Sequence, residues 1–285
     1  STLSSSSAAS DVYKRQDICT FVFAIGILLF VTIPQPSKSE EGEKPRTMLD
    51  DMAFGFKYIF ARKGFMWLAL TFMLTNFVFN FAFAVLTPMV LLRTGDNAQL
   101  LGIVMAMGGI GGFAGGLLLS VWGGPKRRVV CILVGILIEG LSVILMGFGN
   151  ASVSVLLVTW SVSFFLNGAM GPIVFGSSQS IWQSKVSPDL QGRVFAARGM
   201  LAMMVAPLGL LIGGPLADYV FEPAMGRGGL FTDVFGWFSG TVPGSGMAVM
   251  FAIAGFFIIT FMIIAYFNRD LRHLEDLPDH NAGGE

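Results

Sequence analysis

The chain has 285 residues, of which 54% are hydrophobic and only 13% are charged, and its mean hydropathy is +0.71. Soluble globular proteins carry about 25% charged residues, so this composition excludes the soluble classes and indicates an integral membrane protein. The formal net charge is zero, so nothing in the charge balance points to a nucleic-acid partner.

The first sixteen residues do not read as native protein. Residues 6–16, SSAASDVYKRQ, look like the translation of a transposase adapter used to prepare sequencing libraries, and residues 1–5 fit the primer end before it. We therefore expect residues 1–16 to be a sequencing artefact and exclude them from fold reasoning. We then expect the natural sequence to start near Asp17, and the apolar run at 17–33 to be the end of a truncated transmembrane helix.

Six apolar segments follow, joined by polar or Gly/Pro-containing stretches. Each has about the 20 residues that an α-helix needs to cross a hydrocarbon layer about 30 Å thick. The sequence therefore predicts an all-α polytopic bundle, with a six-helix transmembrane half at residues 64–267. The predicted spans are residues 65–90, 100–122, 129–148, 153–175, 200–220 and 247–267.

The basic residues predict the orientation of the bundle, because loops on the cytoplasmic side carry an excess of Lys and Arg. Apart from residues 1–16, one set of joints has only Arg93 and Arg227. We therefore expect residues 34–63 and the tail 268–285 to be cytoplasmic, and 91–99, 149–152 and 221–246 to lie outside. The other joints carry Lys38, Lys44, Arg46, Lys57, Arg62, Lys63, Lys126, Arg127, Arg128, Lys185, Arg193, Arg198, Arg269 and Arg272.

Residues 34–63 divide into two parts. Residues 34–46, PQPSKSEEGEKPR, are a charged, Pro-rich linker with too little apolar content to pack. Thr47 and Asp50 have the spacing of a capping box and predict the start of a helix with apolar residues at helical spacing. This amphipathic helix either lies on the membrane surface or docks against the bundle. The polar, Gly-rich tail is expected to be frayed.

No arrangement of side chains in the sequence indicates an enzyme, a cofactor or a metal centre. His273 and His280 have no Cys or carboxylate at metal-ligand spacing. There is no phosphate-binding loop ending in Lys-Ser/Thr, which argues against an ATP-driven pump. The spans also contain no Ser/His pair, paired Asp or His cluster, so an intramembrane enzyme is disfavoured.

Polar residues inside the spans are costly and therefore are candidates for function. Glu139 lies in the middle of an aliphatic span, where a carboxyl could carry a proton; the alternative is a carboxyl satisfied by a neighbouring helix. Asn76 and Asn80 are one helical turn apart, and Asn167 precedes Pro172. With Phe72 and Phe83 beside the first pair, these amides could bind an amphipathic compound; alternatively they could form hydrogen bonds between helices.

Glycine and proline also recur inside the spans. The runs at 108–116, GGIGGFAGG, and 209–214 are expected to let helices pack closely, in preference to binding a ligand. Pro207 and Pro215 are expected to break the span at 200–220, which suits a protein that changes shape.

The stretch at 179–199, QSIWQSKVSPDLQGRVFAARG, and the basic turn at 122–128, WGGPKRR, resemble the major facilitator superfamily of transporters. The closer resemblance is to the branch that exports drugs and siderophores. It covers about residues 18–267 and implies the C-terminal six-helix half of that fold, plus the end of the preceding helix.

The resemblance implies that the spans at 65–90 and 153–175 line a substrate cavity. It places Lys126, Arg127, Arg128, Asp189 and Arg193 at a cytoplasmic gate, although the basic turn lacks the Asp of the family motif.

The resemblance places Glu139 on a peripheral helix, which weakens a direct substrate role. The implied function is proton-coupled efflux of a small amphipathic compound by alternating access. A lysophospholipid transporter of the same fold and a non-transporting membrane assembly factor are the alternatives. The implied partners are the lipid bilayer, the substrate and the N-terminal six-helix half. The implied location is a bacterial cytoplasmic membrane.

Overall fold

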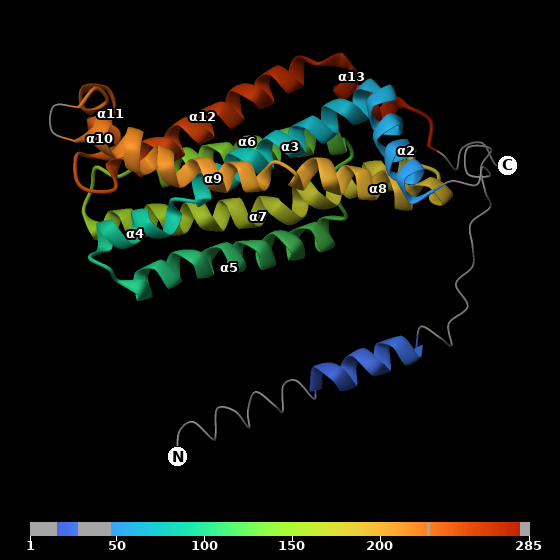
Figure 1. The fold of residues 1–285 in the computed structure, drawn as a ribbon, viewed down its shortest axis with the longest axis horizontal. Coiled ribbons are helices and arrows are strands. Elements are labelled where there is room, and N and C mark those ends of the chain that lie inside the picture. Colours follow the sequence, from blue (N-terminus) through green and yellow to red (C-terminus); the bar gives the residue numbers. More distant parts are fainter. Residues whose placement is uncertain (1–15, 28–46, 227–228, 280–285) are drawn as a thin grey trace. The chain divides into compact units, whose positions relative to one another are not determined.

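A computed structural model describes residues 16–27, 47–226 and 229–279 of the protein (Figure 1). The chain forms two compact units, Ser1–Glu41 and Gly42–Glu285. In the first unit the described part is an apolar helix, Gln16–Ile27, which overlaps the predicted truncated helix from Asp17 onward. The predicted artefact, apart from Gln16, the linker at 34–46 and the last residues of the tail lie outside the described residues.

The second unit, where it is described, is built from helices without strands, and six of its spans are long and apolar enough to cross a membrane. The predicted all-α bundle is therefore confirmed. The spans are Lys63–Thr94 (α3, Lys63–Phe83, and α4, Leu86–Thr94), α5 (Ala98–Trp122), α6 (Arg128–Met146), α7 (Val153–Lys185), Pro188–Met225 (α8, Pro188–Met203; α9, Ala206–Leu216; the π-turn Ala217–Phe221; α10, Glu222–Met225) and α12 (Ser245–Phe267).

Two helices extend further than hydropathy predicts. α7 continues ten residues beyond 175, and α8 begins at Pro188, well before residue 200. Both extensions are polar, so hydropathy does not predict them. Their buried residues nevertheless recur at the spacing of a helix. On α7 the buried residues include Ser177, Ser178, Ile181 and Trp182, and on α8 they are Leu190, Val194, Ala197 and Leu201.

Proline accounts for both breaks within the spans. Pro cannot donate to the carbonyl four residues before it, and its ring clashes with that carbonyl. The break between α3 and α4 falls at residues 84–85, before Pro88, and the break between α8 and α9 falls at 204–205, before Pro207. The predicted break at Pro207 is therefore confirmed, whereas the predicted break at Pro215 is wrong, because α9 runs through that residue to Leu216. α7 runs through Pro172 without a break.

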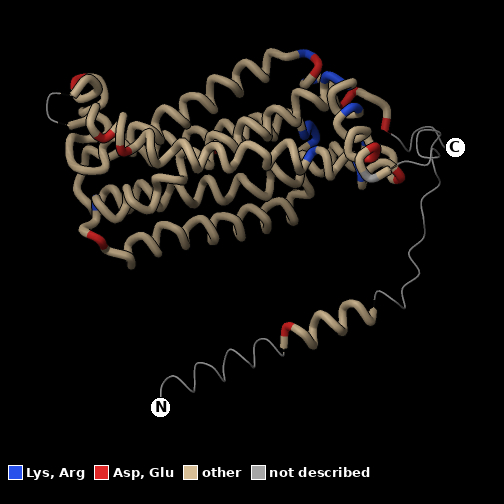
Figure 2. Tube along the Cα trace, in the orientation of Figure 1, with Lys and Arg blue, Asp and Glu red and all other residues tan. Residues whose placement is uncertain are grey.

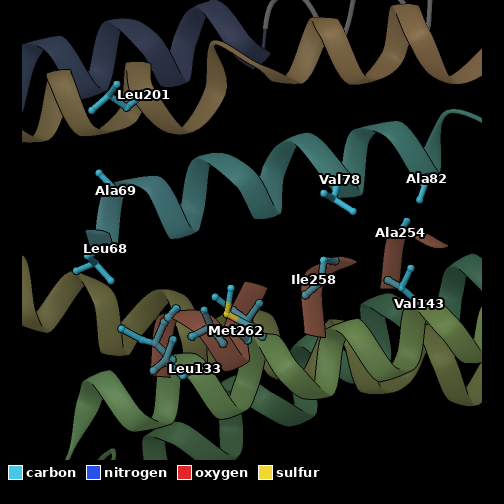
Figure 3. Packing of buried hydrophobic residues seen from close by; sticks show 14 of the residues in the cluster. Leu68, Ala69, Val78, Ala82, Leu133, Val143, Leu201, Ala254, Ile258 and Met262 are labelled. Atoms are coloured by element: carbon cyan, nitrogen blue, oxygen red, sulfur yellow. The ribbon is translucent and has the colours of Figure 1, made fainter. Parts of the chain in front are cut away.

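The helices of the second unit pack in a definite order. α7 contacts α5 and α6, α6 contacts α12, and α3 contacts α12, α8 and α9 (Figure 1). Figure 3 shows the core formed between these elements. Buried residues of the core include Leu68, Ala69, Val78 and Ala82 of α3, Leu133 and Val143 of α6, Leu201 of α8, and Ala254, Ile258 and Met262 of α12.

The glycines of α5 pack its backbone against that of α7. A Cβ on Gly111 would overlap the carbonyl oxygen of Phe165, and a Cβ on Gly115 would overlap that of Ala169. Gly168 of α7 meets the carbonyl of Gly108 in the same way. Small residues allow this approach of two backbones, so the interpretation of residues 108–116 as a packing surface is confirmed.

α2 (Met48–Ala61) begins as predicted and docks on the bundle. The Thr47 hydroxyl accepts from the Asp50 N–H, and the Asp50 carboxylate accepts from the Thr47 N–H at 3.0 Å. α2 packs against α8, where Gly55 lies against the carbonyl of Arg193. The structure therefore supports the interpretation of this segment as a helix docked on the bundle.

Charged residues gather at the two ends of the helices in the second unit (Figure 2). We call one end the basic end, which comprises α2, the turn before α6, the joint between α7 and α8, and the tail from Asn268 onward. We call the other the Arg93 end, which comprises the joints at 95–97, 147–152 and 221–244. The basic residues thus lie on alternate joints, as the sequence predicts.

Candidate functional site

A small pocket lies where α3, α6, α7 and α12 meet. We call it the Phe83 pocket. Its volume is about 10 Å³, which is room for about one water molecule. The pocket is therefore closed to organic compounds in this conformation. Its lining residues are Phe83, Ser142, Val143, Met146, Ser163, Phe164, Asn167 and Phe251.

Aromatic rings form one side of the Phe83 pocket. The ring of Phe83 stands edge-on to those of Phe164 and Phe251, with ring centroids 5.6 Å and 6.0 Å apart. Edge-to-face pairs of this kind stabilise a core beyond the area that they bury. The predicted residue Phe83 is thus fixed by contacts from two other helices.

Polar atoms without partners form the other side of the pocket. Among the described residues, the buried Nδ2 of Asn167 and Oγ of Ser163 have no hydrogen-bond partner. The Ser142 hydroxyl, by contrast, donates to the carbonyl of Glu139 at 2.7 Å. A buried amide without a partner is costly, so Asn167 is a candidate binding group, and its role in substrate binding stays a prediction. This residue was predicted; Ser163 was not, because a serine in an apolar helix gives no distinctive signal.

The structure places Asn76, Asn80 and Phe72 away from this pocket. The Asn76 Nδ2 donates to the carbonyl of Phe72 at 2.9 Å, and the Asn80 Nδ2 donates to the carbonyl of Asn76 at 2.8 Å. Asn80 lies against Gly209 of α9. The amide nitrogens are therefore used within α3 itself, and a role of these residues in substrate binding stays a prediction.

Glu139 lies on α6 and is only 6% exposed. Within the described part of the chain, its carboxyl group has no hydrogen-bond or ion-pair partner. α6 packs against α7 and α12, and Glu139 does not line the Phe83 pocket. An isolated intramembrane carboxyl is a candidate proton carrier, and that role also stays a prediction.

The five predicted gate residues all lie at the basic end, in two separate groups. Arg193 pairs with Asp51 of α2, with 2.9 Å between Nε and Oδ1, and Asp189 accepts from the Ser187 hydroxyl near the start of α8. Lys126, Arg127 and Arg128 form the other group, at the start of α6.

The tail contributes contacts that the sequence analysis did not anticipate. Glu275 accepts from the backbone N–H of Arg128 at 2.9 Å and of Val129 at 3.1 Å, while Leu271 and Leu274 are buried. The expectation of a frayed tail is therefore wrong for residues 268–279. Leu271 and Leu274 are three residues apart and follow Asn268, which is the N-cap of a short helix. This pattern in the sequence could have indicated the docking.

The Arg93 end is held by one buried guanidinium. Arg93 is 8% exposed and donates to the carbonyls of Gly149 and Ser239 at 2.8 Å and 2.6 Å, and to the Ser245 hydroxyl at 3.0 Å. Glu222 accepts from the backbone at the start of α12. These contacts hold the described parts of this joint, residues 221–226 and 229–244 with α11 (Thr232–Ser239), at the Arg93 end.

Comparison with known proteins agrees with this architecture. The family model described as Major Facilitator Superfamily matches residues 18–210. The chain is 29% identical to macrolide efflux protein A of Streptococcus pyogenes over 37% of the chain and 25% of the relative. It is 26% identical to macrolide efflux protein A of Enterococcus faecalis over 68% and 59%, respectively. It is 25% identical to the multidrug efflux pump Tap of Mycolicibacterium fortuitum over 70% and 47%.

The chain spans between a quarter and about three fifths of the length of these relatives. No solved structure matches it significantly. The family match nevertheless covers more than half of the chain, and it includes the first four of the spans described above and the start of the fifth. The protein belongs to the major facilitator superfamily.

Proposed function

We propose that the protein exports small amphipathic organic compounds of the drug type across a bacterial cytoplasmic membrane. The observation that carries the proposal is the Phe83 pocket, in which aromatic rings and an unpaired amide meet between four helices. The similarity to bacterial proteins named as macrolide and multidrug efflux proteins supports the same function.

The chemistry of the pocket suits such compounds. The rings of Phe83, Phe164 and Phe251 contact an apolar body, and the Asn167 amide donates to a carbonyl or ether oxygen of the substrate. The pocket is closed to organic compounds, so export requires the helices to separate. Alternating access, in which the two halves of a transporter rock about a site at the bilayer midplane, supplies such an opening when α3 and α7 also shift relative to α6 and α12. In this proposal the second half faces α3 and α7, and siderophore-type compounds are further candidate substrates.

The basic end faces the cytoplasm in this proposal. The excess of Lys and Arg at that end supports the orientation, with the tail on the cytoplasmic side. The Arg193–Asp51 ion pair and the Lys126, Arg127 and Arg128 turn then lie at the cytoplasmic gate.

Replacement of Asn167 by leucine tests the binding role. We expect export of a macrolide and of a fluorescent amphipathic dye to fall about fivefold, the equivalent of one lost hydrogen bond. Export is measured in cells that lack their own major pumps and express the complete gene, at matched amounts of membrane-inserted protein.

The control is Thr159→Val on the same helix, because the Thr159 hydroxyl bonds within α7 and lies outside the pocket. The double variant with Asn76→Leu and Asn80→Leu is measured in parallel. A loss of efflux in that variant would extend the proposed site along α3. Unchanged efflux in Asn167→Leu would contradict the proposed site, and an absence of efflux in the wild type would contradict the proposed function.

Glu139 is the proposed proton carrier, and Glu139→Gln tests it. The amide cannot exchange a proton, so we expect dye efflux to lose its dependence on an imposed pH gradient, while Glu139→Asp retains it at a lower rate. The measurement is efflux from proteoliposomes at several internal and external pH values. A wild-type pH dependence in Glu139→Gln would reduce Glu139 to a packing residue.

A further inference from the structure

A second, larger pocket opens at the basic end, between the start of α6, the end of α12 and the tail. The tail here comprises α13 (Arg269–Arg272) and the 3-10 turn Leu274–Asp276. We call this cavity the tail pocket, and its volume is about 470 Å³. Its lining residues are Lys126, Arg127, Val130, Tyr266, Arg272, His273, Glu275 and Asp276.

The tail pocket has an excess of unpaired positive charge. Within the described residues, Lys126, Arg127 and Arg272 have no carboxylate partner, although the guanidinium of Arg272 lies 5.6 Å from the centre of the Tyr266 ring. Three cations that share one cavity repel each other, so an anion bound among them would be stabilised.

The two acidic residues of the pocket reduce its positive charge but leave it net positive, since two carboxylates accompany three cations. Neither carboxylate pairs with those cations, because each has another partner. Both oxygens of Glu275 accept from backbone N–H groups at the start of α6. The Asp276 carboxylate lies against the His273 imidazole. The donors that stay available in the tail pocket are therefore those of the lysine and the two arginines.

The position of the tail pocket matches the headgroup layer of a membrane. It lies where two membrane spans end, since α6 begins at Arg128 and α12 ends at Phe267. The exposed surface of α12 is apolar, with Phe256, Phe257 and Ile264 each more than half exposed. Tyr266 and Phe267 occupy the end of the span, where aromatic residues favour the interface.

We propose that the tail pocket binds the phosphate headgroup of an anionic phospholipid, whose acyl chains lie along the apolar surface of α12. Basic pockets between membrane helices suit such headgroups, and arginine binds phosphate through paired N–H donors. A bound lipid joins the turn before α6 to the tail and thereby stabilises the basic end. This site is separate from the Phe83 pocket and does not depend on the exported compound.

The test measures thermal unfolding of the detergent-purified protein with increasing dioleoylphosphatidylglycerol. Dioleoylphosphatidylcholine and inorganic phosphate are the parallel ligands. We expect the phosphatidylglycerol to raise the unfolding temperature and the other two ligands to leave it unchanged. Each Lys or Arg near an anionic headgroup contributes about a fivefold gain in affinity. Lys126→Gln should therefore raise the half-saturating lipid concentration about fivefold. The triple variant, with Arg127→Gln and Arg272→Gln added, should raise it on the order of 100-fold.

Lys57→Gln is the matched control, because Lys57 is an exposed cation of α2 that does not line the tail pocket. It should respond to the lipid as the wild type does. An equal lipid response in the triple variant would overturn the proposal, as would an equal loss in Lys57→Gln. Stabilisation by inorganic phosphate at the same concentrations would assign the pocket to a free anion and overturn the lipid. The single variant keeps the test valid if the triple variant does not fold.

Discussion

Alanine at Gly115 is expected to lower the free energy of unfolding by about 1–3 kcal/mol, the usual cost of overpacking a close contact. The added Cβ would overlap the carbonyl oxygen of Ala169. That obstacle is backbone, so a change of side-chain rotamer cannot remove the overlap and α5 must move away from α7. Gly111→Ala, which meets the carbonyl of Phe165, should have a similar effect.

The same helix provides controls for this experiment. A Cβ on Gly116 or on Gly109 meets nothing within 4 Å. Gly116→Ala should therefore be neutral or slightly stabilising, because alanine favours a helix over glycine by up to about 1 kcal/mol. Thermal unfolding in detergent, with the wild type and the four single variants in parallel, measures the difference. Equal stability of Gly115→Ala and Gly116→Ala would show that α5 and α7 are not in backbone contact.

Alanine at Arg93 is expected to destabilise the protein by about 3–5 kcal/mol, because it removes several buried hydrogen bonds from a charged donor, each of which contributes about 1.5–3 kcal/mol. Its guanidinium satisfies the carbonyls of Gly149 and Ser239 and the hydroxyl of Ser245. Without it the buried Gly149 carbonyl loses its donor, and the Ser239 carbonyl keeps only the longer bond from the Ser245 hydroxyl, at 3.3 Å. The joint at 221–244 should then open, and limited proteolysis should cut it faster than in the wild type.

Arg93→Lys separates charge from geometry in this cluster. The lysine keeps the positive charge but lacks the planar fork of donors, so we expect it to recover only part of the lost stability. Lys57→Ala, at an exposed position of the basic end, serves as the control for loss of a cation. If Arg93→Ala unfolds and is cleaved like Lys57→Ala, then Arg93 does not hold the joint.

The spans were predictable because their length and hydropathy are set by the membrane itself. The bounds of α5, α6 and α12 differ from the predicted ones by two residues or fewer at each end. The prediction failed for α7 and α8, whose polar ends carry no hydropathy signal. There, burial of Trp182 and Leu190 against other helices extends the helical structure, and that packing depends on residues distant in the sequence.

The candidate site was only partly predictable for a related reason. Asn76, Asn80 and Asn167 carry the same side-chain amide, and each lies inside a predicted membrane span. The sequence therefore suggested one role for all three. Asn76 and Asn80 find acceptors one turn earlier on α3, whereas the Asn167 nitrogen has no partner among the described residues. Whether an amide bonds its own helix depends on its rotamer and its neighbours, and neither can be read from spacing alone.

The contact between α5 and α7 also has a mechanical consequence. Where two helices meet through backbone atoms, a shift of one past the other cannot be absorbed by side chains, so the pair has little compliance. Any rearrangement of this bundle must therefore move α5 and α7 together as one rigid body. The bending that such a rearrangement requires falls on the interrupted helices, at residues 84–85 and 204–205, because Pro88 and Pro207 cannot donate to the carbonyls of Ala84 and Met203.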